Sequence, residues 1–99
     1  MNQNLLVRNN KAIINVAKKN QISYLALFGS HARGEQKKDS DVDLLVKFNQ
    51  PVDFFELYDV EKELENALHK KVDLVTVEGM SKYILPYIQP DLKILYESA

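Results

Sequence analysis

A chain of 99 residues with 45% hydrophobic and 27% charged side chains has the composition of one globular domain. It is long enough to bury a core without disulfides or structural metals. Its formal net charge of −1 argues against a general nucleic-acid binder, and the lack of cysteine excludes disulfides and thiolate metal sites. The first ten residues lack the features of a secretion signal, and no apolar run approaches the roughly 20 residues of a membrane span. A cytoplasmic protein without direct nucleic-acid or membrane partners is therefore expected.

The first expected element is a helix over residues 5–20. Its lysine-rich end suits a helix C-terminus, and its apolar side chains recur at helical spacing, namely Leu6, Ile13, Val16 and Ala17. A strand over residues 22–28 follows, and its mostly apolar residues indicate burial on both faces.

Gly29 and Ser30 end this strand and begin a polar connector that runs to a second apolar strand. Gly29 allows a sharp turn and the close approach of a ligand to the backbone. If Ser30 opens a helical turn, the free N–H groups of that turn would bind phosphate oxygens. The connector therefore predicts a phosphate site at its start.

Asp41 and Asp43 stand where the second strand begins. On a strand, residues two apart point to the same face with Cα atoms roughly 6.6 Å apart, so Val42 and Leu44 would face the other way. Two carboxylates about 5 Å apart repel by roughly 3 kcal/mol at an effective dielectric near 20. Mg²⁺, which prefers a few carboxylates plus substrate phosphates, would offset that repulsion. A phosphate site beside a metal site is typical of phosphoryl or nucleotidyl transfer.

Three polar residues of the connector are further candidates. Arg33 would hold a triphosphate oxygen through its planar guanidinium, or it would pair on the surface with Glu35 or Asp39. Ser40 would either fix the start of the strand or contact a phosphate, and the sequence favours neither. His31 could also contact a phosphate, but a solvated loop residue is expected.

A second long helix is expected from residue 53 to residue 68. Asp53 and Glu56 resemble a capping box at its start. Its expected core face consists of Phe54, Leu57, Tyr58, Leu64, Ala67 and Leu68. The opposite face is expected to be solvated and includes Glu61, Lys62, Glu65 and Asn66.

Residues 72–77 predict a third strand that carries Asp73 in an apolar run. A buried aspartate needs a partner. If this strand lies beside the one with the two earlier aspartates, Asp73 becomes a third carboxylate at the same site. The alternative is an ion pair with Lys70 or Lys71 at the strand end.

A short helix over residues 79–89, with Pro86 late in it, and an edge strand within residues 91–97 complete the chain. We therefore expect an α/β domain with a small mixed sheet, helices mainly on one face and the acidic site on the exposed face.

The spacing Gly29-Ser30, ten residues, Asp41-Val42-Asp43 resembles the signature of the polymerase-beta-like nucleotidyltransferases. The residues around it are similar to the minimal nucleotidyltransferase (MNT) branch, and the resemblance runs from Tyr24 to Val77. It implies that residues 1–99 form a single minimal nucleotidyltransferase domain.

The resemblance also implies roles for the candidate residues. Asp41 and Asp43 would hold one or two Mg²⁺ ions, and Asp73 would complete the second metal site and accept the proton of the attacking hydroxyl. The nucleotide-binding residues would be Gly29 and Ser30 at the β- and γ-phosphates, Arg33 at the leaving pyrophosphate, and Ser40.

Stand-alone MNT proteins resemble the antitoxin of HEPN–MNT toxin–antitoxin pairs. That family implies a hetero-oligomer in which AMP passes from ATP to a tyrosine hydroxyl of the HEPN toxin and silences its RNase activity. Two alternatives stay open. One is a non-catalytic module that blocks a helical partner by contact. The other alternative is transfer to a small molecule, as in the aminoglycoside nucleotidyltransferases that share the motif. It is ranked last because those enzymes form the acceptor pocket with an extra helical domain, for which 99 residues leave no room within a monomer.

Overall fold

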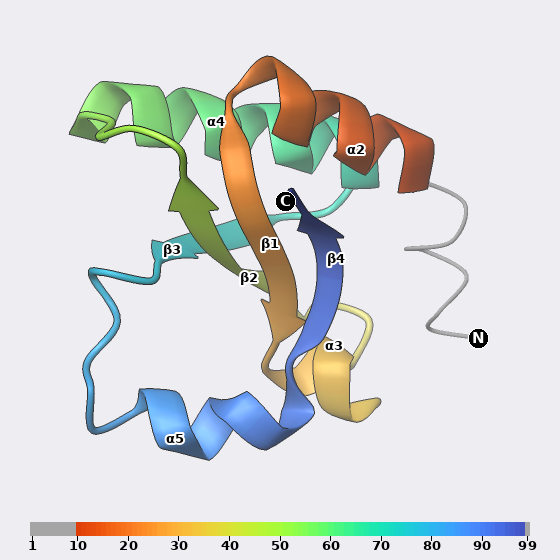
Figure 1. Ribbon diagram of the computed structural model, residues 1–99. Helices are drawn as coiled ribbons and strands as arrows, with labels where there is room; N and C mark the ends of the chain where they lie inside the picture. The colour runs from red at the N-terminus through yellow and green to blue at the C-terminus, as the bar shows by residue number, and fades with distance from the viewer. Residues whose placement is uncertain (1–9, 99) are drawn as a thin grey trace.

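The computed structural model describes residues 10–98 and contains one four-stranded sheet with helices (Figure 1). The predicted helix over residues 5–20 is described as α2 (Asn10–Lys19), and residues 5–9 of that prediction lie outside the described part. The other elements are β1 (Ile22–Phe28), α3 (Ser30–Arg33), β2 (Val42–Phe48), α4 (Phe54–Leu68), β3 (Val72–Thr76), α5 (Leu85–Ile88), the 3₁₀ turn η1 (Gln89–Asp91) and β4 (Lys93–Glu97).

The sheet is mixed, as predicted, and its strand order is β3-β2-β1-β4. β1 pairs antiparallel with both β2 and β4, whereas β2 and β3 run parallel. A parallel pair needs a crossover connection, and α4 is that connection. β3 and β4 are therefore the two edge strands, which confirms the edge position expected for the last strand.

α2 and α4 cover the same face of the sheet (Figure 1). Ile13 and Ala17 of α2 and Leu64 of α4 are buried against alternate residues of the strands, among them Val42 and Leu44. Because side chains alternate along a strand, the residues between these point to the opposite face, which we call the open face. The expected arrangement of helices mainly on one face is confirmed.

The start of α4 confirms one prediction and corrects another. Asp53 accepts a hydrogen bond from the Glu56 N–H at 2.7 Å, and Glu56 accepts one from the Asp53 N–H at 2.9 Å, so the capping box is present. The prediction that Phe54 and Tyr58 belong to the core is wrong, because they are 80% and 52% exposed. The fully buried residues of α4 begin only at Val60, since the first turns of the helix reach past the sheet.

The predicted helix over residues 79–89 is also wrong in its extent. α5 begins only at Leu85, and Pro86 stands in its first turn rather than near its end. Proline lacks an N–H, and the first N–H groups of a helix have no partner within it, so proline fits at a helix start. Tyr83, Ile84 and Tyr87 are exposed. No helix in residues 10–98 is both long enough and apolar enough to cross a bilayer.

Candidate active site

Two of the predicted carboxylates lie side by side on the open face. In the parallel pairing of β2 with β3, Asp43 stands opposite Asp73. Adjacent strands are about 4.8 Å apart, and paired residues project to the same face. The flanking residues Val42 and Leu44 point into the core, as predicted. The fold thus brings together aspartates that are 30 positions apart in the sequence.

The environment of Asp43 disfavours its negative charge. Burial raises the pKa of Asp43 above its ordinary value, and the carboxylates of Asp73 and Asp41 raise it further. His31 and Arg33 act in the opposite direction. Asp41 is exposed and lies just before β2, whereas Asp43 is half-buried within it. A cation at this position would therefore relieve a repulsion that the protein itself does not cancel.

Gly29 lies directly against the carboxylate of Asp43. A Cβ atom placed on Gly29 would collide with Oδ2 of Asp43, and the φ angle of +78° lies in the left-handed region that favours glycine. The carbonyl of Gly29 accepts hydrogen bonds from the N–H groups of Ala32 (3.1 Å) and Arg33 (3.2 Å). Gly29 thus opens α3 and leaves room for Asp43 at the same time.

The predicted helical turn at Ser30 is present as α3. The first N–H groups of any helical turn have no partner within it. Gly34, with a φ angle of +72°, ends the turn. Ser30 is therefore the first residue of a helical turn, as predicted, and this turn begins beside Asp43.

His31 is buried, so the expectation of a solvated loop residue is wrong. Its Nε2 lies 3.2 Å from the carbonyl oxygen of Ser40, which means that Nε2 carries the proton and donates it. The hydroxyl of Ser40 accepts a hydrogen bond from the N–H of Lys37 at 2.8 Å. Of the two alternatives for Ser40, this geometry is the one in which it fixes the start of the strand. The burial of His31 has no local signal in the sequence, because burial in a polar connector depends on tertiary contacts.

Arg33 forms the surface pair that was one of its two predicted alternatives. Its Nε lies 2.9 Å from Oε1 of Glu35, and this hydrogen bond is the largest cause of the raised pKa of Arg33. Asp43 and Asp91 also contribute to that rise, so Arg33 lies within the electrostatic range of the acidic site. Within residues 10–98 its two Nη groups have no protein partner, because the pair with Glu35 uses Nε alone.

Asp73 does not form the predicted alternative pair with the lysines that precede it. Lys70 instead donates a hydrogen bond to the carbonyl of Lys38 at 3.0 Å. The ion pairs found in the described part of the chain involve neither Asp73 nor Asp43. Both carboxylates therefore remain available to a ligand.

Two glutamates of α4 accept hydrogen bonds from the strand that carries Asp73, and neither was predicted to do so. Oε2 of Glu61 accepts from the N–H of Leu74 at 2.9 Å, and Oε2 of Glu65 accepts from the N–H of Val72 at 3.1 Å. The hydrogen bond from Val72 is the largest cause of the lowered pKa of Glu65. The expectation that these residues are solvated is therefore wrong. The available signal was an i, i+4 pair of acids on the helix that precedes an edge strand.

The carboxylate pair fits a divalent cation that arrives with phosphates better than a cation held by protein alone. Within the described residues, no group of three or more His, Cys, Asp or Glu side chains is placed to hold a metal ion. Mg²⁺ is commonly bound by one or two carboxylates together with substrate phosphates. Asp43 and Asp73 supply such a pair, and none of the ion pairs found within residues 10–98 involves either carboxylate.

Comparison with known proteins identifies the family of the chain. The family model described as "Polymerase beta, Nucleotidyltransferase" matches residues 11–99. Protein MJ0128 of Methanocaldococcus jannaschii is 38% identical over 89 residues, which is 88% of each chain. Protein adenylyltransferase MntA of Thermococcus cleftensis is 45% identical over 60 residues, which is 61% of each chain.

The structural comparison gives the same result. A crystal structure of a toxin–antitoxin with AMP-PNP superposes with a TM-score of 0.77 at 27% identity, covering 91% of this chain and 74% of the other. The family match spans nearly all of the described residues, and the paired aspartates lie in the same domain. The chain therefore belongs to the polymerase beta nucleotidyltransferase family.

Proposed function

We propose that this protein is an antitoxin that transfers AMP from ATP to a tyrosine hydroxyl of a cognate HEPN-domain RNase toxin and thereby inactivates the toxin. The observation that carries the proposal is the pairing of Asp43 with Asp73 on the open face, with Gly29 packed against Asp43. The adenylyltransferase name of a relative and the AMP-PNP bound in a similar toxin–antitoxin structure support the choice of ATP and of a protein acceptor.

The acidic residues would have two roles, which are to bind the metal ions and to accept the proton of the attacking hydroxyl. Asp41 and Asp43 would hold one or two Mg²⁺ ions, which neutralise triphosphate charge when bound, and Asp73 would complete the second position. The tyrosine oxygen attacks the α-phosphorus, the bond to the leaving pyrophosphate breaks, and Asp73 takes the hydroxyl proton. Because α2 and α4 cover only the other face, the open face leaves room for the acceptor.

The connector would hold the triphosphate. Gly29 and Ser30 place the backbone of α3 beside the acids, where its free N–H groups would bind the β- and γ-phosphates. Arg33 would use its Nη groups to stabilise charge on pyrophosphate while Nε stays bonded to Glu35. Ser40 would contribute through the turn that it closes, which holds His31 and the start of β2.

A labelling experiment tests this proposal. The protein, Mg²⁺ and α-labelled ATP are incubated with the candidate toxin, and intact mass counts the AMP units added. We expect the wild-type protein to label the toxin and Asp43→Asn to abolish the label. The matched control Asp39→Asn, in the exposed connector, should still label the toxin.

Two results would contradict the proposal. A stable complex that inhibits the toxin without label would indicate a binding module that acts by contact. Label that stays on the toxin with Asp43→Asn would show that the carboxylate pair is not the catalytic site.

A further inference from the structure

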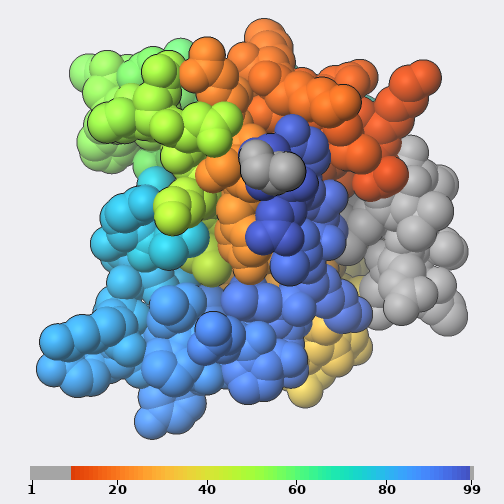
Figure 2. Space-filling model, in the orientation of Figure 1, coloured from red at the N-terminus to blue at the C-terminus, as the bar shows by residue number. Residues whose placement is uncertain are grey.

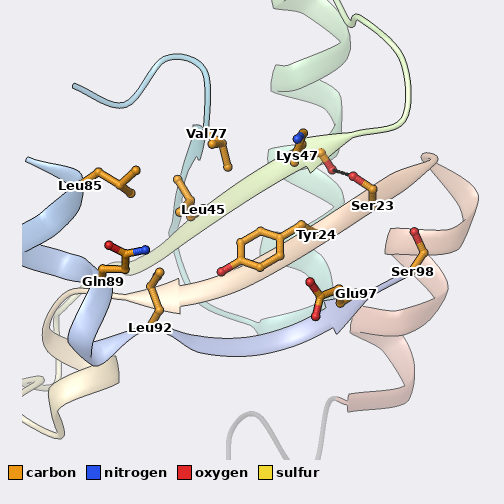
Figure 3. A pocket seen from close by; sticks show the side chains of 10 residues that line it. All are labelled: Ser23, Tyr24, Leu45, Lys47, Val77, Leu85, Gln89, Leu92, Glu97 and Ser98. Atoms are coloured by element: carbon orange, nitrogen blue, oxygen red, sulfur yellow. Dashed lines mark hydrogen bonds between the residues drawn. The ribbon is translucent and has the colours of Figure 1, made fainter. Parts of the chain in front are cut away.

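A pocket of about 410 Å³ lies on the open face (Figure 3). Leu45 contributes to its floor and stands two residues after Asp43 on the same strand, so both side chains project to this face. Leu85 of α5 and Gln89 of η1 line the side of the pocket. In the space-filling view, α5 and η1, in blue, border the strands at their lower end (Figure 2).

The sheet register places this pocket at a defined distance from the acids. Successive rows of side chains on one face are roughly 6.6 Å apart. Asp43 and Asp73 form one row, Leu45 belongs to the next, and Lys47 pairs with Tyr24 in the third. The span from the α-phosphorus of a nucleotide across its ribose to its base is of the same order. A nucleotide with its phosphates at the acids would therefore reach this pocket with its base.

The pocket offers apolar contacts and a side-chain amide that carries both a hydrogen-bond donor and an acceptor. Leu45, Leu85 and Leu92 supply apolar surface, and the Tyr24 hydroxyl points toward Gln89 and Leu92 (Figure 3). Burial, and then the nearby Glu97 carboxylate, raise the pKa of Tyr24, so this hydroxyl stays protonated. The side-chain amide of Gln89 makes no hydrogen bond within the part of the chain that the structure describes.

From this arrangement we infer that the pocket binds the base of the nucleotide substrate and that Gln89 selects adenine. An amide can accept from the N6 amino group of adenine and donate to the ring nitrogen N7 at once. At the same edge guanine presents two acceptors, O6 and N7, so the amide would make only one of the two bonds. The inference rests on the proposed function, because it places the triphosphate at the carboxylate pair.

The test compares Gln89→Leu with a matched control, Gln50→Leu. Both glutamines are exposed, but Gln50 follows the far end of β2 and does not line this pocket. Calorimetry with Mg²⁺ measures the Kd of ATP and of GTP for the whole chain. We expect Gln89→Leu to weaken ATP binding about tenfold, consistent with loss of a bidentate amide–adenine pair, to weaken GTP binding clearly less, and to leave the toxin KM unchanged. Gln50→Leu should change none of these.

Three outcomes of these measurements would contradict the inference. If Gln89→Leu raises the toxin KM and leaves the ATP Kd unchanged, the pocket binds the acceptor. If neither changes, or if ATP and GTP weaken equally, the amide does not read the base. Failure of the wild-type protein to transfer AMP to the toxin would contradict the proposed function instead, and the ATP and GTP affinities would still test this inference.

Discussion

On the face of the sheet that α2 and α4 cover, β2 contributes Val42, Leu44 and Val46, and all three are fully buried. On the open face the same strand contributes Asp43, which is half-buried and pairs in register with Asp73. A strand alternates its side chains between two faces, so one short segment can stabilise the fold and carry the chemistry with different residues. The comparison predicts that substitutions on the two faces will have separable effects on stability and on transfer.

The largest expected effect on stability comes from the covered face. Leu44→Ala leaves a cavity in the core and should lower the free energy of unfolding by about 3 kcal/mol. Ile94→Ala, on the open face and 55% exposed, should cost less than about 0.5 kcal/mol. Urea denaturation of both variants checks this. Equal losses would show that the two faces are not distinct in stability.

Substitution of Gly29 should affect both stability and transfer, because this residue has a positive φ angle and also contacts the Asp43 carboxylate. Gly29→Ala should cost about 2 kcal/mol through its positive φ and should also displace the Asp43 carboxylate and reduce transfer. Gly34→Ala is the matched control, since its φ is also positive but nothing lies within 4 Å of the added Cβ. Unfolding and labelling are measured for both. If Gly34→Ala reduces transfer as much, contact with Asp43 is not the cause.

The hydrogen bonds from α4 to β3 should have a smaller effect. Glu61→Leu leaves the Leu74 N–H without its acceptor and should cost about 1 kcal/mol, with reduced transfer because Asp73 lies next to Leu74. Glu61→Gln keeps an acceptor oxygen and should restore most of both. A Gln variant as impaired as the Leu variant would show that charge, rather than the hydrogen bond, matters here.

The smallest effect is a pH dependence. Because the folded-state pKa of Asp43 is raised, its contribution to stability is fully present below the ordinary aspartate pKa near 3.9 and is lost as the pH rises through the folded value. Without metal, Asp43→Asn should therefore become more stable than the wild type as the pH rises through that range. Denaturation midpoints at a series of pH values measure the difference. A wild type that gains stability over Asp43→Asn with rising pH would contradict the stated direction.

The sequence was informative where local chemistry decides the structure. The Gly29-Ser30 turn, the Asp53–Glu56 capping box and the alternation around Asp43 each follow from neighbouring residues, and the structure places all three as expected. The position of Asp73 beside Asp43 needed only the assumption that the strands are adjacent.

The remaining features depend on contacts between distant segments. Burial of His31 requires the Ser40 carbonyl, and the roles of Glu61 and Glu65 require an edge strand beside their helix. Exposure of Phe54 depends on how far α4 extends past the sheet, which hydrophobic periodicity does not report. Such features follow from the packed fold and not from local pattern.

The central claim is that the paired aspartates of the open face perform nucleotidyl transfer without contributing to stability. The most direct test measures toxin labelling and urea stability together for Asp43→Asn. We predict complete loss of label at neutral pH with a stability equal to or above that of the wild type. Retained label, or loss of label accompanied by unfolding comparable to that of Leu44→Ala, would contradict the claim.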